Sequence, residues 1–261
     1  MTTNEYLSSV EPTAATKGEK HMYTQRKLAI AAGVLYLITH VTSVGAAFLY
    51  TPVQDNPGYI LGAGTDFPIL LGVFLEVILA LTVIGTAVAL YPAVKRQNEA
   101  VALGYIGLRT LEAGIIAVGV IPLLALVTLR ELVGTVGADP ATLVSIGHTL
   151  VAFHNWTFLL GPGLVCGTNT VLMAYLMYRS RLVPRFIPVL GLVGGPLIFA
   201  VNAAQLFGLY DRLPAWAGIA VIPIFSWELT LAIWLIIKGF RSSATTNESA
   251  TKTANELLIA A

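Results

Sequence analysis

Three glutamates and one arginine interrupt stretches of the sequence that are otherwise apolar. They are Glu76, Arg109, Glu112 and Glu228. Arg109 and Glu112 are three residues apart, so on a helix they lie on one face and can form an ion pair. Because one arginine cannot neutralise three carboxylates, the remaining carboxylates must be protonated, or they must hold a cation or another ligand. This chemistry suits a buried site that binds a small molecule or relays protons.

Two histidines and two asparagines in the same apolar stretches are further candidates for such a site: His40, His154, Asn155 and Asn202. Imidazoles from two helices can jointly ligate a haem iron or another metal, so a site formed by His40 and His154 is an alternative. The sequence contains no HExxH pattern, no Gly-rich phosphate loop and no GxSxG motif. Its one cysteine, Cys166, rules out an internal disulfide and a CxxC metal pair. We therefore predict no cofactor and no dedicated metal centre.

The composition places these polar groups in a membrane. Only 11% of the 261 residues are charged, against about 25% in a typical soluble domain, and the mean hydropathy is +0.77. Six apolar blocks are long enough to span a bilayer as helices, which takes about 20 residues. They are approximately 27–50, 67–93, 101–129, 146–178, 184–209 and 215–238. The sequence thus predicts an all-α integral membrane bundle of six transmembrane helices with short loops, over residues 26–240.

The distribution of basic residues predicts the orientation of this bundle. Lys and Arg concentrate on the cytoplasmic side of membrane proteins, and 12 of the 15 Lys and Arg residues fall on one side of the predicted spans. Only Arg130 and Arg212 fall on the other side. Both termini are therefore expected in the cytoplasm, with polar and disordered tails at 1–25 and 241–261. The net charge of +1 gives no indication of nucleic-acid binding.

Proline and glycine predict where the helices begin or are interrupted. Asp139 followed by Pro140 is typical of a helix start, which places the beginning of the fourth helix near Ala141. GPG at 161–163 and GGP at 194–196 are expected to interrupt the fourth and fifth helices. Small residues also allow helices to approach closely, and the chain is compatible with a homo-oligomer. FLEVILAL at 74–81 resembles SWELTLAI at 226–233 and aligns Glu76 with Glu228, as in a short internal repeat.

The depths of the charged residues can be estimated from the rise of a helix. Counted inward from Leu103, Arg109 lies about 9 Å deep and Glu112 about 14 Å deep. Counted from Pro68 at the opposite face, Glu76 lies about 12 Å deep. Glu76, Glu112, Glu228 and Arg109 are therefore expected at broadly similar heights, and convergence of the three carboxylates on one cavity would distinguish a binding site from charges that only hold helices together. Arg109 is expected to point into the bundle and to reach at least one of these carboxylates, because an unpaired guanidinium at that depth is costly.

Four stretches of the chain resemble a known bacterial family. They are LYLITHVTSVGAAFLYTPV, LEVILALTVIGTAVALYPAVKRQNE, LGYIGLRTLEAGIIAVG and PRFIPVLGLVGGPLIFA. In this order, with Glu76, Arg109 and Glu112 in place, they are similar to the family of domain of unknown function 4386 over about residues 27–240. The resemblance implies a multi-pass protein of the bacterial cytoplasmic (inner) membrane. It implies no activity and no catalytic residues.

Three classes of function remain open from the sequence. The first, which we favour, is a transporter-like or ligand-binding protein that uses the carboxylates and Arg109 to bind a small molecule or a proton. The second is a membrane-embedded enzyme or a haem or metal redox protein that uses His40, His154 and the carboxylates. The third is an accessory or structural protein whose charges only hold helices together. Apart from the lipid bilayer, no partner can be named from the sequence.

Overall fold

The chain forms a helical bundle, which we describe from a computed structural model. The described residues are 14–56, 58–62, 64–135, 137, 139–210 and 215–241, and side chains are described from residue 24 onward except at 55 and 215–217. The α-helices are α1 (Ala14–Asp55), α2 (Phe67–Val94), α3 (Glu99–Arg130), α4 (Pro140–Phe158), α5 (Cys166–Ser180), α6 (Phe186–Leu206) and α7 (Val221–Ile237). A π-helical segment (Leu159–Val165) joins α4 to α5, and short 3-10 turns lie at Tyr59–Leu61 and Ala215–Ala220.

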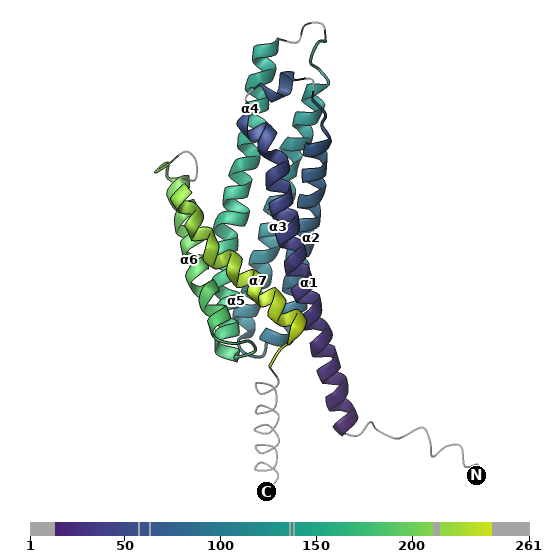
Figure 1. Ribbon diagram of the computed structural model, residues 1–261, viewed down its shortest axis with the longest axis vertical. Helices are drawn as coiled ribbons and strands as arrows, with labels where there is room; N and C mark the ends of the chain where they lie inside the picture. Colours follow the sequence, from purple (N-terminus) through teal and green to yellow (C-terminus); the bar gives the residue numbers. More distant parts are fainter. Residues whose placement is uncertain are drawn as a thin grey trace, which may run out of the picture.

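Six helical spans in this bundle are long and apolar enough to cross a membrane, as predicted. The α4, π-helical and α5 segments form one of them, Pro140–Ser180. Figure 1 shows α1 to α4 side by side, whereas α7 crosses obliquely from α6 toward the beginning of α1. We call the end with the α1–α2 and α3–α4 connections the distal end, and the end where α1 begins and α7 finishes the proximal end. Among the described residues there is no strand.

Several helix boundaries differ from the prediction. The helix α1 begins at Ala14, so residues 14–25, expected in a disordered tail, have a helical backbone. The reason is that this stretch is rich in Ala, Lys and Glu, which readily extend a helix that the membrane span has already nucleated. The fourth span begins at Pro140 rather than 146, as the Asp139–Pro140 signal indicates: the Asp139 side chain accepts from the Thr142 amide at 3.0 Å. Residues 1–13 and 242–261, which include the rest of the predicted tails, lie outside the described residues.

The two proline motifs behave differently. Gly161, Pro162 and Gly163 lie in the π-helical segment, so the predicted interruption of the fourth span is confirmed as a local change of helix type. At GGP 194–196 the helix α6 is not interrupted, because it continues as an α-helix through Pro196; a bend of α6 at this motif stays a prediction. A proline removes only one backbone hydrogen-bond donor from a helix. In a membrane bundle, neighbouring helices can stabilise the helix despite this loss.

Glycines on α6 and α1 allow both helices to pack closely against α7. A Cβ atom on Gly194 would lie 2.4 Å from the backbone nitrogen of Ile224, and one on Gly33 would lie 2.6 Å from the carbonyl oxygen of Ala232. The end of α7 is held against α1 by Arg26, whose guanidinium donates to the carbonyl oxygens of Leu235, Ile236 and Ile237 at 2.8–3.2 Å. The last carbonyls of a helix lack the usual amide partners further along the chain, so Arg26 caps the C-terminal turn of α7, where the Leu235 carbonyl also accepts from the amide of Gly239 at 3.1 Å.

Three groups of buried apolar side chains follow one another along the bundle. The proximal group surrounds Met173 and Trp227, and the distal group surrounds Ile69 and Leu123. A small middle group separates them and consists of Leu79, Ala80, Val83, Ala113 and Ile116. The buried charged residues lie on either side of this middle group.

Candidate functional site

Arg109 lies at the centre of the larger polar cluster. Its guanidinium is 3% exposed and has a partner for each nitrogen. Nε donates to the hydroxyl of Tyr105 at 3.1 Å, and the two terminal nitrogens donate to Glu112 at 3.1 Å and to Glu228 at 3.3 Å. Glu112 is on α3 and Glu228 is on α7, which packs mainly against α1 and α6. Arg109 therefore bridges two helices that are not close neighbours.

Further polar side chains surround this guanidinium. The amide nitrogen of Asn169 donates to Glu112 at 2.7 Å, which leaves the buried amide oxygen of Asn169 without a partner among the described residues. The hydroxyl groups of Tyr36 and Tyr105 are 3.2 Å apart, and their rings lie 5.5 and 5.7 Å from the Arg109 guanidinium carbon. Such aromatic faces stabilise a cation at these distances.

His40 extends the cluster toward the surface between α1 and α7. Its Nδ1 lies 2.9 Å from the carbonyl oxygen of Tyr36, and its Nε2 lies 3.8 Å from Glu228. The Phe225 ring packs edge-on against the imidazole, with centroids 4.5 Å apart. The side chains of His40 and Glu228 are 10% and 15% exposed, so they are the most accessible charged groups of the cluster. We call the set Tyr36, His40, Tyr105, Arg109, Glu112, Asn169 and Glu228 the Arg109 centre.

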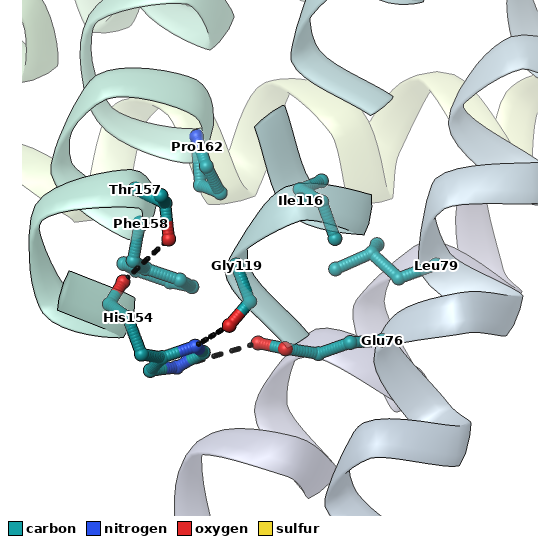
Figure 2. A pocket seen from close by; sticks show the side chains of 8 residues that line it. All are labelled: Glu76, Leu79, Ile116, Gly119, His154, Thr157, Phe158 and Pro162. Carbon is teal, nitrogen blue, oxygen red and sulfur yellow. Dashed lines mark hydrogen bonds and ion pairs between the residues drawn. The ribbon is translucent and has the colours of Figure 1, made fainter. Parts of the chain in front are cut away.

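A second polar cluster lies nearer the distal end and contains Glu76 (Figure 2). The carboxylate of Glu76 on α2 faces the imidazole of His154 on α4, with 3.7 Å between Oε1 and Nε2. The other imidazole nitrogen, Nδ1, lies 2.9 Å from the carbonyl oxygen of Gly119 on α3. The ring of Tyr50 on α1 packs edge-on against His154 with centroids 5.1 Å apart. We call Tyr50, Glu76, Gly119 and His154 the Glu76 site.

A small cavity of about 10 Å³ adjoins the Glu76 site, which is about the space that one water molecule needs. Its lining residues are Glu76, Leu79, Ile116, Gly119, His154, Thr157, Phe158 and Pro162, shown together in Figure 2. The space is narrow and suits water rather than a larger molecule. Leu79 and Ile116 belong to the middle apolar group, so the cavity ends where that group begins. Along α3, Gly119 is seven residues, or about 10 Å, from Glu112.

The predicted position of Arg109 is confirmed, since it points into the bundle and reaches Glu112 and Glu228. The estimate of similar heights is wrong for Glu76, and the three carboxylates do not converge on one cavity, because Glu76 belongs to a separate site with His154. The depth estimates counted inward from opposite faces and assumed spans of bilayer length. The helices α2 and α3 contain 28 and 32 residues, so positions counted from opposite ends lie further apart than estimated.

The remaining candidates are dispersed. The Asn155 side chain is exposed on the outside of α4. Asn202 is buried on α6, where its amide donates to the carbonyl oxygen of Ile198 at 2.8 Å, and its side chain packs against Gly163 of the π-helical segment. His40 and His154 lie in different clusters. The described residues contain no group of three or more His, Cys, Asp or Glu side chains placed to hold a metal, and a haem or metal site remains an untested alternative.

The sequence analysis missed three tyrosines that complete these sites. Tyr105 is four residues before Arg109, and Tyr36 is four residues before His40, so each pair shares a helix face. That spacing could have identified both. Tyr50 has no charged residue or histidine three or four positions away on α1, so the sequence spacing does not reveal its contact with His154.

One known protein family matches most of the chain. No curated protein and no solved structure matches the chain. The family described as Domain of unknown function (DUF4386) matches residues 31–239, a range that includes both polar clusters and reaches all six spans. The match extends over most of the chain and agrees with the resemblance carried by the segments around Glu76, Arg109 and Glu112, and the chain therefore belongs to the DUF4386 family.

Proposed function

We propose that this protein is a transporter-like membrane protein that binds a proton or a small cation at the Arg109 centre. The observation that carries the proposal is that one buried guanidinium is shared by two carboxylates, Glu112 and Glu228. With both carboxylates ionised, these three side chains carry one negative charge in excess. An uncompensated buried charge is costly, so the centre gains stability when a positive charge is added.

Accessibility within the centre indicates where the positive charge binds. Glu112 is held by both Arg109 and Asn169, whereas Glu228 has Arg109 on one oxygen and only His40, at 3.8 Å, near the other. Glu228 is also the more exposed of the two carboxylates. We therefore assign Glu228 and His40 as the groups that take up the proton or contact the cation, and Arg109 and Glu112 as the groups that position them.

The test measures stabilisation of the folded protein by added cations. A ligand that binds only the folded state raises the melting temperature in a saturable manner. The full chain, reconstituted in lipid nanodiscs, is unfolded thermally in a pH series and with sodium, potassium, methylammonium and guanidinium as probes. We expect at least one of these cations or the proton to raise the melting temperature of the wild type. The Glu228→Gln variant removes the excess charge and should lose this response.

Glu131→Gln is the matched control, because Glu131 is an exposed carboxylate just after α3. It should respond as the wild type does. If the wild type and Glu228→Gln respond identically to every probe, the Arg109 centre only holds helices together and the accessory class becomes the better description.

We also propose that the proximal end faces the cytoplasm of a bacterial inner membrane, on the basis of the basic residues described above. The test uses Gln97→Cys and Glu131→Cys in a Cys166→Ser background, since Gln97 and Glu131 are exposed at opposite ends of the bundle. A membrane-impermeant maleimide should label Cys at 131 in intact cells. It should label Cys at 97 only after permeabilisation, and the reverse pattern would show that the orientation is inverted.

A further inference from the structure

We propose that the Glu76 site is a second, separate proton-binding site, in which Glu76 and His154 share one proton beside a water-sized cavity. The proposal rests on the geometry of this site and does not depend on the function proposed for the Arg109 centre. The two sites lie on opposite sides of the middle apolar group.

The contact between His154 and Gly119 fixes the tautomer of the imidazole. A carbonyl oxygen can only accept a hydrogen bond, so Nδ1, which lies 2.9 Å from the Gly119 oxygen, carries a hydrogen. In a neutral imidazole the other nitrogen then has a lone pair. That nitrogen, Nε2, is the one that faces the carboxylate of Glu76 at 3.7 Å.

This tautomer determines how many protons the pair holds. With no added proton, the Nε2 lone pair faces an ionised carboxylate, and the buried site has one uncompensated negative charge. With two added protons, an imidazolium faces a neutral carboxylic acid, and the site has one uncompensated positive charge. With one proton, either on Glu76 or on Nε2, the site is neutral or forms an ion pair. Burial therefore favours the one-proton state over both others.

Unpartnered polar atoms indicate that water takes part in the site. Glu76 is 3% exposed and Tyr50 is 2% exposed. The hydroxyl of Tyr50 interacts with the carboxylate of Glu76, but neither this hydroxyl nor the second carboxylate oxygen of Glu76 makes a hydrogen bond of normal geometry among the described residues. Buried polar groups rarely lack partners unless an ordered water or ligand supplies them. The separation of 3.7 Å between Glu76 and His154 is too long for a direct hydrogen bond, so a water in the adjacent cavity that contacts both groups would carry the proton between them.

Few other groups compete for this proton. The titratable group that faces Glu76 from α1 is Tyr50, and the one from α4 is His154. From α3 and the π-helical segment, the residues that line the cavity are Ile116, Gly119 and Pro162, none of which titrates. The proton is thus exchanged between Glu76 and His154 through water in the cavity. Apart from these two, the described residues that line the cavity include no ionisable side chain that could bind the proton.

Gly119 is required for this arrangement. A Cβ atom at position 119 would lie 2.4 Å from the Thr157 hydroxyl and 3.7 Å from Nδ1 of His154, so a larger residue would push α4 away from α3. The absence of a side chain at Gly119 leaves the backbone of α3 open to a side chain from α4.

The experiment is infrared difference spectroscopy of the full chain in nanodiscs, with a pH step from neutral as the probe. Carboxylic acid and imidazolium groups have distinct bands, so the location of the proton can be read directly. At neutral pH the wild type should show one of the two bands from this site and not both. Glu76→Gln should remove the band whichever group holds the proton. His154→Gln should remove an imidazolium band, whereas a carboxylic acid band should persist because burial keeps the lone Glu76 protonated. The band should shift in H2-18O if water is hydrogen-bonded to the pair.

Asn155→Gln is the control for the His154 variant, because Asn155 is the next residue on α4 and is exposed. Glu228→Gln is the control for the Arg109 centre, and it should leave the band unchanged whether or not that centre binds cations. The proposal is overturned if the wild type shows an ionised carboxylate beside a neutral imidazole at neutral pH. It is also overturned if the band persists in Glu76→Gln.

Discussion

The Arg109→Ala variant should give much less folded protein in the membrane than the wild type does. The substitution leaves Glu112 and Glu228 buried without the guanidinium that both of them contact. Removing one partner of a buried ion pair typically costs about 3–5 kcal/mol, and a native protein is stable by only about 5–15 kcal/mol. The expected result is a large fall in the yield of monodisperse protein after detergent extraction, measured by size-exclusion chromatography, and a lower melting temperature for the remainder.

Two further variants identify the cause of this loss. Arg109→Lys keeps the charge, but an ammonium group cannot reproduce the three directed contacts to Tyr105, Glu112 and Glu228, so it should rescue the yield only in part. Adding Glu228→Gln to Arg109→Ala removes one of the stranded charges and should recover stability relative to Arg109→Ala alone. A wild-type yield and melting temperature for Arg109→Ala would mean that the carboxylates are neutral without the arginine.

The sequence was sufficient to predict the number of spans and the inward orientation of Arg109. Both follow from one strong physical constraint, which is the cost of placing polar groups in a hydrocarbon layer. The pairing of Arg109 with Glu112 follows from their spacing on one helix. The α4 start was also readable, because an aspartate and a proline at a helix N-terminus satisfy its free amides locally.

The partners across helices could not be predicted in the same way. Whether Glu76 joins Glu112 or His154 depends on how far α2 and α4 slide along α3, and that is decided by packing at positions such as Gly119 and Gly147. Neither a Glu76–Glu112 contact nor a Glu76–His154 contact produces a characteristic spacing in the sequence. The short repeat that aligns Glu76 with Glu228 has a counterpart in the structure, since each of these glutamates faces a histidine whose Nδ1 contacts a backbone carbonyl.

Gly194→Ala tests the packing that places Glu228. The added Cβ would lie 2.4 Å from the Ile224 nitrogen, 2.8 Å from its Cα and 2.9 Å from the Pro223 carbonyl carbon. All three are backbone atoms, so no side chain can turn aside to make room, and α7 must move away from α6. Overpacking of this kind costs typically 1–3 kcal/mol, and the backbone clash places Gly194→Ala at about the upper value. Thermal unfolding in nanodiscs should show a clearly lowered melting temperature.

Gly114→Ala is the matched control, since a Cβ on Gly114 of α3 would meet no heavy atom within 4 Å. Gly114→Ala should raise the free energy of unfolding by about 0.5–1 kcal/mol, because alanine restricts the unfolded chain and favours a helix. Ile224 is one helical turn before Glu228, so moving α7 at Ile224 also moves Glu228 away from Arg109. Gly194→Ala should therefore weaken the response to cations as well as the stability, whereas a variant as stable and as responsive as the wild type would mean that α6 and α7 do not meet at Gly194.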